Sequence, residues 1–153
     1  MNPFMKAAID EAIAGVDAAH GGPFGAAVVH NGTVIAVGHN NVVATHDPTA
    51  HAEILAIRAA CEKLGRFDLS DCELYTTCEP CPMCYAAAWW ARIRTIYYGC
   101  SRDDAAEIGF DDAAIYDDLE GKTDRQVNML QIERDGCLVP MQRWESRPDR
   151  VPY

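Results

Sequence analysis

The sequence has few basic residues for its length. Lys and Arg number 13 against 23 Asp and Glu, and the formal net charge is −10. A protein that binds a phosphate backbone neutralises it with Lys and Arg, and no segment here carries a basic stripe. The composition therefore argues against nucleic acid as a partner. The electrostatic field of this negative charge would not affect the binding of a small neutral molecule.

Long apolar runs are absent as well. A transmembrane helix needs about 20 consecutive apolar residues, and Asp10 and Glu11 interrupt the stretch near the amino terminus where a secretory leader would be uninterrupted. We therefore expect a cytoplasmic protein without a membrane partner. The chain also has no repeat at a solenoid period and no low-complexity tract. Its 153 residues predict one domain, 1–153, around a single core.

Helical and strand-forming patterns alternate along the chain. Helical patterns cover 4–19, 50–64, 81–93, 103–109 and 111–121, and strand-forming runs cover 24–30, 33–39, 72–78, 94–100 and 127–133. Asn31-Gly32 between the first two strands favours a hairpin turn. Strands that alternate with helices imply crossovers and a sheet covered on both faces. This order predicts an α/β fold, a three-layer α/β/α sandwich with a five-stranded mixed sheet.

The seven cysteines are an odd number in a chain without an export signal, which favours metal binding or burial over a disulfide framework. Cys81 and Cys84 are three residues apart at the expected start of a helix, so both sulfurs lie on one face, near amide groups that favour thiolate. His51 begins the preceding helix and is the nearest third donor. Three protein ligands leave the fourth position of a tetrahedral zinc to water, as in a catalytic site.

Glu53 lies two residues after His51, in the same first turn of the helix. It would take a proton from the zinc-bound water and deliver it elsewhere. The order H-x-E followed by P-C-x-x-C is the signature of zinc deaminases, in which the glutamate is the acid and base and not a ligand.

These motifs have simpler interpretations. A CxxC pair can be buried packing or a redox pair, and an isolated HAE in a helix usually has no such role. Cys78 continues the cysteine spacing, but an iron–sulfur run needs a further cysteine followed by proline, which is missing here. If Cys78 joined Cys81, Cys84 and His51, the result would be a non-catalytic, structural zinc module closed to water. We expect instead that Cys78 is buried at a strand end.

The chain resembles the cytidine-deaminase-fold zinc enzymes and, among them, the bacterial guanine deaminases. The motifs that carry the resemblance are GGPFGA at 21–26, HNN at 39–41, DPTAHAE at 47–53, AIRAAC at 56–61, CEPCPMC at 78–84, WAR at 90–92 and IGFDD at 108–112. They cover nearly the whole chain to about residue 117. HAE with PCxxC is common to the superfamily and implies the cytidine deaminase-like fold and its chemistry, whereas GFDD, Trp90 and the tail point to guanine.

The resemblance implies hydrolysis of guanine to xanthine and ammonia, with one Zn²⁺ per subunit on His51, Cys81 and Cys84, and Glu53 as the proton carrier. The rest of the site follows from the same resemblance and consists of Asn40, Asp112, Phe24, Trp90 and Tyr153.

Among these substrate residues, the carboxylate of Asp112 would accept from N1–H and the 2-amino group of guanine, whereas adenine presents an acceptor at N1. Asn40 would hydrogen-bond the base, and Phe24 and Trp90 would wall the pocket. Asp112 can equally cap the next helix, and aromatic residues at such places are often core packing. Trp89 and Trp90 point to different sides of a helix, so at most one of them reaches the site.

The family also implies a homodimer in which the carboxy-terminal segment, about 140–153, is exchanged between subunits and Tyr153 covers the neighbour's site. The stretch PDRVP at 148–152 departs from the family pattern. Related deaminases that act on guanosine, cytosine, a triazine or tRNA adenosine are the alternatives. The acidic charge disfavours tRNA, and a pocket closed by Tyr153 would exclude a ribose.

Overall fold

The computed structural model describes residues 1–123, 127 and 129–152. The chain divides into two compact units, Met1–Tyr116 and Asp117–Tyr153. The first unit holds the sheet and the motifs that the sequence singled out.

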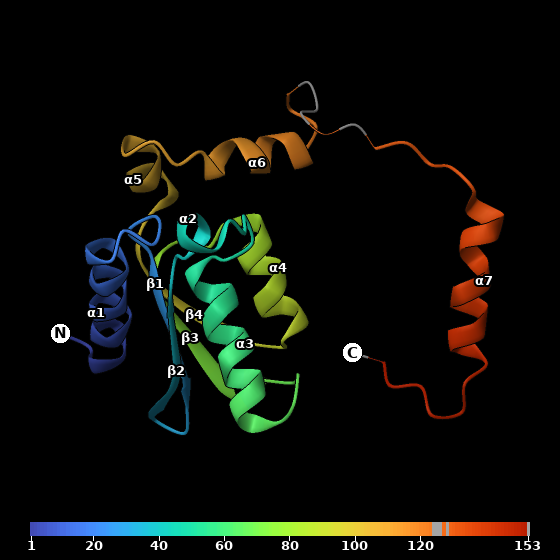
Figure 1. Ribbon diagram of the computed structural model, residues 1–153, viewed down its shortest axis with the longest axis horizontal. Helices are drawn as coiled ribbons and strands as arrows, with labels where there is room; N and C mark the ends of the chain where they lie inside the picture. Colours follow the sequence, from blue (N-terminus) through green and yellow to red (C-terminus); the bar gives the residue numbers. More distant parts are fainter. Residues whose placement is uncertain (124–126, 128, 153) are drawn as a thin grey trace. The chain divides into compact units, whose positions relative to one another are not determined.

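Four strands form the sheet of the first unit, in the order β2-β1-β3-β4 (Figure 1). They are β1 (Gly25–His30), β2 (Thr33–His39), β3 (Cys72–Cys78) and β4 (Thr95–Cys100). β1 is antiparallel to β2 and β3, whereas β3 and β4 are parallel, so the sheet is mixed as predicted. Asn31 and Gly32 both have positive φ, as the hairpin turn requires.

Helices cover both faces of this sheet and make three layers (Figure 1). α1 (Pro3–Asp17) packs on one face, and α3 (Ala52–Leu64) and α4 (Pro82–Trp90) pack on the other. Successive side chains of a strand point to opposite faces. Accordingly, Val28 of β1 packs into the core beneath α3 and Val29 into the core beneath α1. The α/β fold and its layers are therefore confirmed.

Shorter helices complete the first unit and lead out of it. α2 (Val42–Thr45) follows β2, α5 (Arg102–Glu107) follows β4, and α6 is Asp112–Leu119. α3 ends at Gly65, which adopts the left-handed conformation expected of a helix C-cap. All seven cysteines are free thiols, in agreement with the argument against a disulfide framework. None of the helices that the structure describes combines the length and the apolar character of a membrane span.

The prediction of a fifth strand at 127–133 is wrong for the described part of that range. Val127 and residues 129–133 belong to no helix or strand, and the sheet of the described chain has four strands. An alternating pattern becomes a strand only where a neighbouring strand supplies hydrogen bonds and one face is buried. Here Met129, Leu130 and Ile132 are each more than three-quarters exposed.

The second unit contains a helix that the sequence did not predict, α7 (Arg134–Glu145). Asp135-Gly136 and the internal Pro140 are signals that usually interrupt a helix, which explains why the pattern was missed. The assignment of 1–153 to one domain stays a prediction.

Gly25 opens β1 at a point where α1 leaves no room for a side chain. A Cβ there would lie 2.1 Å from the carbonyl oxygen of Ala8 and 2.6 Å from the amide nitrogen of Ala12. Gly25→Ala should push α1 from the sheet and lower the free energy of unfolding by about 1–3 kcal/mol in a urea titration.

Gly136→Ala in α7 is the control, because a Cβ at this position would point into open space, away from the rest of the described chain. Alanine suits a helix interior better than glycine by roughly 0.5–1 kcal/mol, so this change should be neutral or stabilising. A Gly25→Ala protein as stable as the wild type would contradict the close packing of α1 on β1.

Candidate active site

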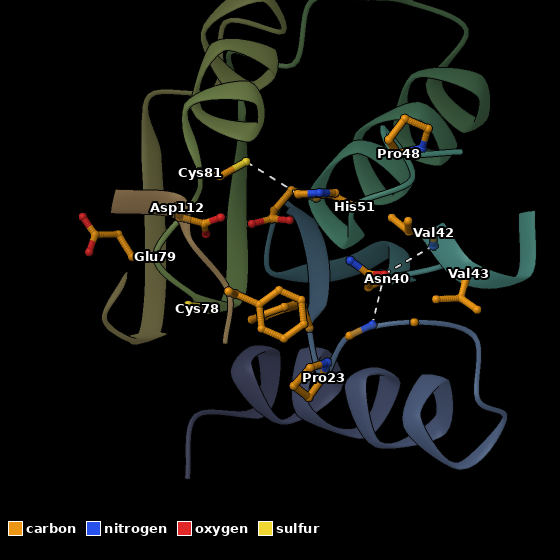
Figure 2. Close-up of a pocket in the computed structure, with 15 residues that line it drawn as sticks. Pro23, Asn40, Val42, Val43, Pro48, His51, Cys78, Glu79, Cys81 and Asp112 are labelled. Atoms are coloured by element: carbon orange, nitrogen blue, oxygen red, sulfur yellow. Dashed lines mark hydrogen bonds between the residues drawn. The ribbon is translucent and has the colours of Figure 1, made fainter. Parts of the chain in front are cut away.

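Two helix N-termini meet at one side of a pocket in the first unit. His51 is the N-cap residue of α3 and Cys81 the N-cap residue of α4, and both have extended backbone dihedrals. Cys84 lies in the first turn of α4. The sequence predicted His51, Cys81 and Cys84 as ligands of one metal, and the structure places the two helix starts that carry them side by side (Figure 2).

The three donor atoms have the separations of a tetrahedral zinc site. The Sγ atoms of Cys81 and Cys84 each lie 3.6 Å from Nδ1 of His51, and all three atoms lie within 4.8 Å of one another. Zinc with Zn–S bonds of about 2.3 Å and Zn–N bonds of about 2.0–2.1 Å holds sulfur and nitrogen roughly 3.6 Å apart. The residues therefore fit a zinc ion, with three protein ligands as in catalytic sites.

Hydrogen bonds inside this group distribute its protons unequally. The hydrogen bond from the Cys84 thiol, with a further one from His51, lowers the pKa of Cys81 to about 4 against the opposing effect of burial. The same bond to the Cys81 thiolate raises the pKa of Cys84, and the bond to Cys81 raises the pKa of His51. One anionic sulfur is thus ready for a cation, and the remaining protons must leave when the metal binds.

Cys78 is not a member of this ligand group in the described chain. It is buried at the end of β3, as expected, and its thiol donates to the carbonyl oxygen of Ser101 at 3.5 Å. Burial raises the pKa of Cys78 to about 11, which keeps it a thiol. The arrangement gives no support to a four-ligand structural module.

Glu53 lies beside the ligand group without belonging to it. Its carboxylate accepts from Thr76 Oγ1 at 3.2 Å and lies 3.4 Å from Sγ of Cys84, and the residue is only 6% exposed. Burial raises the pKa of this carboxyl. A buried carboxyl next to a metal site and free of the metal is suited to accept and return a proton. Thr76, which orients Glu53 from β3, carried no signal in the sequence.

Two of the three ligands, His51 and Cys81, line a cavity of about 510 Å³ together with Glu53 (Figure 2). This volume falls within the usual range for small-molecule sites. Among the residues that line it are Phe24, Asn40, His51, Glu53, Phe110 and Asp112. Of the substrate residues that the resemblance implied, the structure thus brings Phe24, Asn40 and Asp112 together with the metal ligands.

Asn40 is held in one orientation by the backbone around it. Its Oδ1 accepts from the amide groups of Gly22 at 3.2 Å and Val42 at 3.3 Å, which Figure 2 shows as dashed lines. A Cβ on Gly21 would lie 2.1 Å from the same oxygen, so this approach needs glycine. Because the oxygen is occupied, the NH₂ of Asn40 is the group left for a ligand, and it is a donor.

Two carboxylates near the pocket entrance face different ways. Asp112 is the first residue of α6, and its carboxylate is turned into the pocket, whereas that of Glu79 points away from it (Figure 2). Glu79 pairs with Arg102. Burial raises the pKa of Asp112. Its place in the first turn also suits the positive end of the helix dipole, so the capping interpretation remains compatible with the structure.

The aromatic residues divide between the pocket and the surface. Phe24 packs edge-on against Phe110, with ring centroids 4.7 Å apart, and both line the cavity. Phe110 lies inside the IGFDD motif but was not singled out. Trp90 is 52% exposed at the end of α4 and is not brought to the pocket, so its contact with substrate stays a prediction. Tyr153 lies outside the described residues.

Residues 1–100 match the family described as the cytidine and deoxycytidylate deaminase zinc-binding region, and the chain belongs to this family. Within it, the chain is similar to guanine deaminase from Bacillus subtilis, with 46% identity over 151 residues, 98% of this chain and 97% of that protein. The X-ray structure of the B. subtilis enzyme matches with a TM-score of 0.92 and covers 100% of this chain and 99% of that one.

Other relatives match less of the chain. The tRNA-specific adenosine deaminase of Agrobacterium fabrum is 49% identical, but over 89 residues, 57% of this chain and 59% of that protein. A guanine deaminase structure from Nitrosomonas europaea has a TM-score of 0.67 and 41% identity and covers 71% of this chain and 63% of that one. The similarity to the B. subtilis enzyme thus covers nearly the whole chain, and the similarity to the tRNA enzyme covers little more than half of it.

The ligand set predicts which substitutions release zinc. Cys81→Ala and His51→Ala each remove one of three protein ligands and should lower the zinc content of the purified protein from about one ion per chain to a small fraction. Cys78→Ala, the matched control, should keep its zinc. Atomic emission spectroscopy on the folded proteins measures their zinc content. If Cys78→Ala lost zinc while Cys81→Ala and His51→Ala kept it, the predicted ligand set would be wrong.

Proposed function

We propose that this protein is a zinc-dependent guanine aminohydrolase, which converts guanine and water to xanthine and ammonia. One observation carries the proposal. A buried, unligated Glu53 lies beside the His51, Cys81 and Cys84 group, in a chain that a guanine deaminase matches over 98% of its length.

Glu53 is placed for the proton transfers that the reaction needs. Zinc, when bound to its three ligands, supplies a Lewis acid that brings the pKa of a water molecule close to neutrality. Glu53 accepts one proton of the attacking water and delivers it to a ring nitrogen as C2 of the purine becomes tetrahedral. It then takes the proton of the new C2 hydroxyl group and passes it to the amine, which leaves as ammonia while the C2 carbonyl forms. Thr76 holds the carboxylate in place during these transfers.

The polar groups of the pocket complement guanine on two sides. The Asp112 carboxylate accepts from N1–H and the 2-amino group, which are adjacent donors. The NH₂ of Asn40 donates to an acceptor of the base, and guanine offers O6 and N7. Adenine has an acceptor at N1 and an amino group at C6, so it opposes the contact with Asp112 and offers Asn40 no acceptor at C6. Phe24 and Phe110 supply the apolar wall for the purine face.

The assembly that the family implies belongs to the same proposal. It is a homodimer in which residues of about 140–153 are exchanged between subunits and Tyr153 covers the partner site. A site closed in this way admits a free base and excludes the ribose of guanosine. The similarity to the B. subtilis enzyme across the carboxy-terminal part supports this arrangement.

Glu53→Gln tests the proton carrier. The amide keeps the shape of the side chain but cannot accept the proton, so kcat on guanine should fall about 10²- to 10⁴-fold while zinc content and fold are retained. Glu62→Gln, on the exposed end of the same helix, should keep the wild-type rate. A Glu53→Gln enzyme with a normal kcat would end the proposed mechanism.

A panel of free bases and nucleosides, followed by ammonia release, tests the substrate. Guanine should be the preferred substrate, ahead of guanosine, cytosine, adenine and triazines. Asp112→Asn replaces an acceptor by a group that also donates, and should lower kcat/KM for guanine by about 10- to 100-fold, as expected for the loss of a hydrogen bond to a charged group.

Asp111→Asn is the matched control for this substitution, because the neighbouring side chain is exposed and does not line the cavity. Its kinetics should resemble those of the wild type. Equal kcat/KM values for guanine in the wild type and Asp112→Asn would remove the argument for specificity, and a preference for another member of the panel would replace guanine as the substrate.

A further inference from the structure

Three titratable side chains form a hydrogen-bonded chain just behind the pocket. Nδ1 of His39, the last residue of β2, lies 2.7 Å from Oε1 of Glu11 in α1. Nε2 of His39 lies 2.8 Å from Nδ1 of His20, which follows α1 in the sequence. The two imidazole rings are stacked at 26°. We name Glu11, His39 and His20 the histidine chain.

The proton positions in the histidine chain follow from the chemistry of its members. A carboxylate only accepts, so Nδ1 of His39 carries a hydrogen and donates it to Glu11. The facing nitrogens of His39 and His20 can then share a single hydrogen, which either ring can donate. Two imidazolium rings would bring two N–H groups face to face, so the chain keeps its bond only while it carries at most one imidazolium.

The fold holds the histidine chain in close packing. A Cβ on Gly15 of α1 would lie 2.7 Å from Cδ2 of His39, so the ring rests directly on the helix backbone. Ala19, just before His20, adopts a positive φ of 56°, which is uncommon for a residue other than glycine. This turn brings the His20 ring back toward β2. On the other side of β2, α3 presents Leu55 and backbone atoms to Gly38.

Each histidine immediately precedes a residue of the pocket wall. His39 is followed by Asn40, and His20 is followed by Gly21. The two wall segments contact each other. The backbone N–H of Gly22 donates to Oδ1 of Asn40, and the backbone N–H of Asn40 donates to the carbonyl oxygen of Phe24. The carbonyl oxygen of His20 accepts from Val43 and from Ala44.

We propose that the histidine chain positions the Asn40 side of the base pocket, with Glu11, His39 and His20 as positioning residues for purine binding. The chain ties the loop after α1 to the end of β2, and thereby holds the amide of Asn40 in the orientation that donates to the base. It lies apart from the metal ligands and from Glu53. The proposal rests on the proposed function, because its kinetic readout is guanine turnover.

The proposal predicts a change in KM for guanine without a matching change in kcat. His20→Ala removes the last member of the chain, and Glu11→Gln weakens the acceptor while keeping its shape. Each should raise KM for guanine about fivefold to tenfold, the effect of a hydrogen bond of ordinary strength, and leave kcat within about twofold of the wild type. The double variant should be little worse than the more affected single variant, since both act through His39.

His30→Ala is the control for these variants. His30 also pairs with a carboxylate, that of Asp71. It lies at the end of β1 away from Gly25, the residue that pairs with His39, so this variant should retain the wild-type KM.

Three results would overturn the proposal: an unchanged KM in folded His20→Ala and Glu11→Gln proteins, a fall in kcat with constant KM, or additive effects in the double variant. If His20→Ala does not fold, His20→Gln is judged by the same criteria.

A spectroscopic readout keeps the proposal separate from the proposed function. If the zinc-loaded wild type releases no ammonia from guanine, the proposed function fails, and the ¹⁵N NMR signals of the imidazole nitrogens then decide whether the chain exists. Glu11→Gln should shift the signals of both His39 and His20 while that of His30 stays in place. Unchanged signals for His39 and His20 would overturn the histidine chain itself.

Discussion

The site depends on one geometric constraint. Nδ1 of His51 and the Sγ atoms of Cys81 and Cys84 must lie at the distances that a tetrahedral zinc ion, with bonds of about 2 Å, requires. The sheet makes this possible, because α3 and α4 pack on the same face and begin beside each other at the same end. At an N-cap the side chain leaves the helix where amide groups are unpaired, which favours the thiolate of Cys81. The burial of Glu53 beside the ligands and the access to them from the cavity both depend on this junction.

Backbone geometry gives the pocket a defined pattern of hydrogen-bond donors and acceptors. Gly21 lets the chain pass so close to Asn40 that the backbone N–H groups of Gly22 and Val42 take up its side-chain oxygen. The NH₂ that remains is a donor, and Asp112 across the cavity is an acceptor, so opposite sides of the site have opposite hydrogen-bonding character. A planar ligand with donors on one edge and acceptors on another satisfies both, and guanine has this pattern.

Several independent observations agree on a small molecule, rather than a nucleic acid, as the ligand. The net charge of −10 opposes a phosphate backbone, the cavity is of small-molecule size, and the similarity to a tRNA deaminase covers 57% of the chain. The match to a guanine deaminase runs from end to end. The histidine chain adds a link between α1 and the pocket wall that the metal chemistry does not require.

The sequence by itself determined the features that depend on short-range chemistry. Cysteine spacing, helix starts, the Asn31-Gly32 turn and the order of elements were enough to predict the layers, the zinc ligands and Glu53. Only the tertiary structure decided what depends on contacts between distant segments: Thr76 on Glu53, Phe110 against Phe24, the orientation of Asn40, and the meeting of Glu11, His39 and His20. The prediction of a fifth strand was wrong for the same reason. The alternating pattern at 127–133 is typical of a strand, but a strand forms only where a partner strand and a buried face are available.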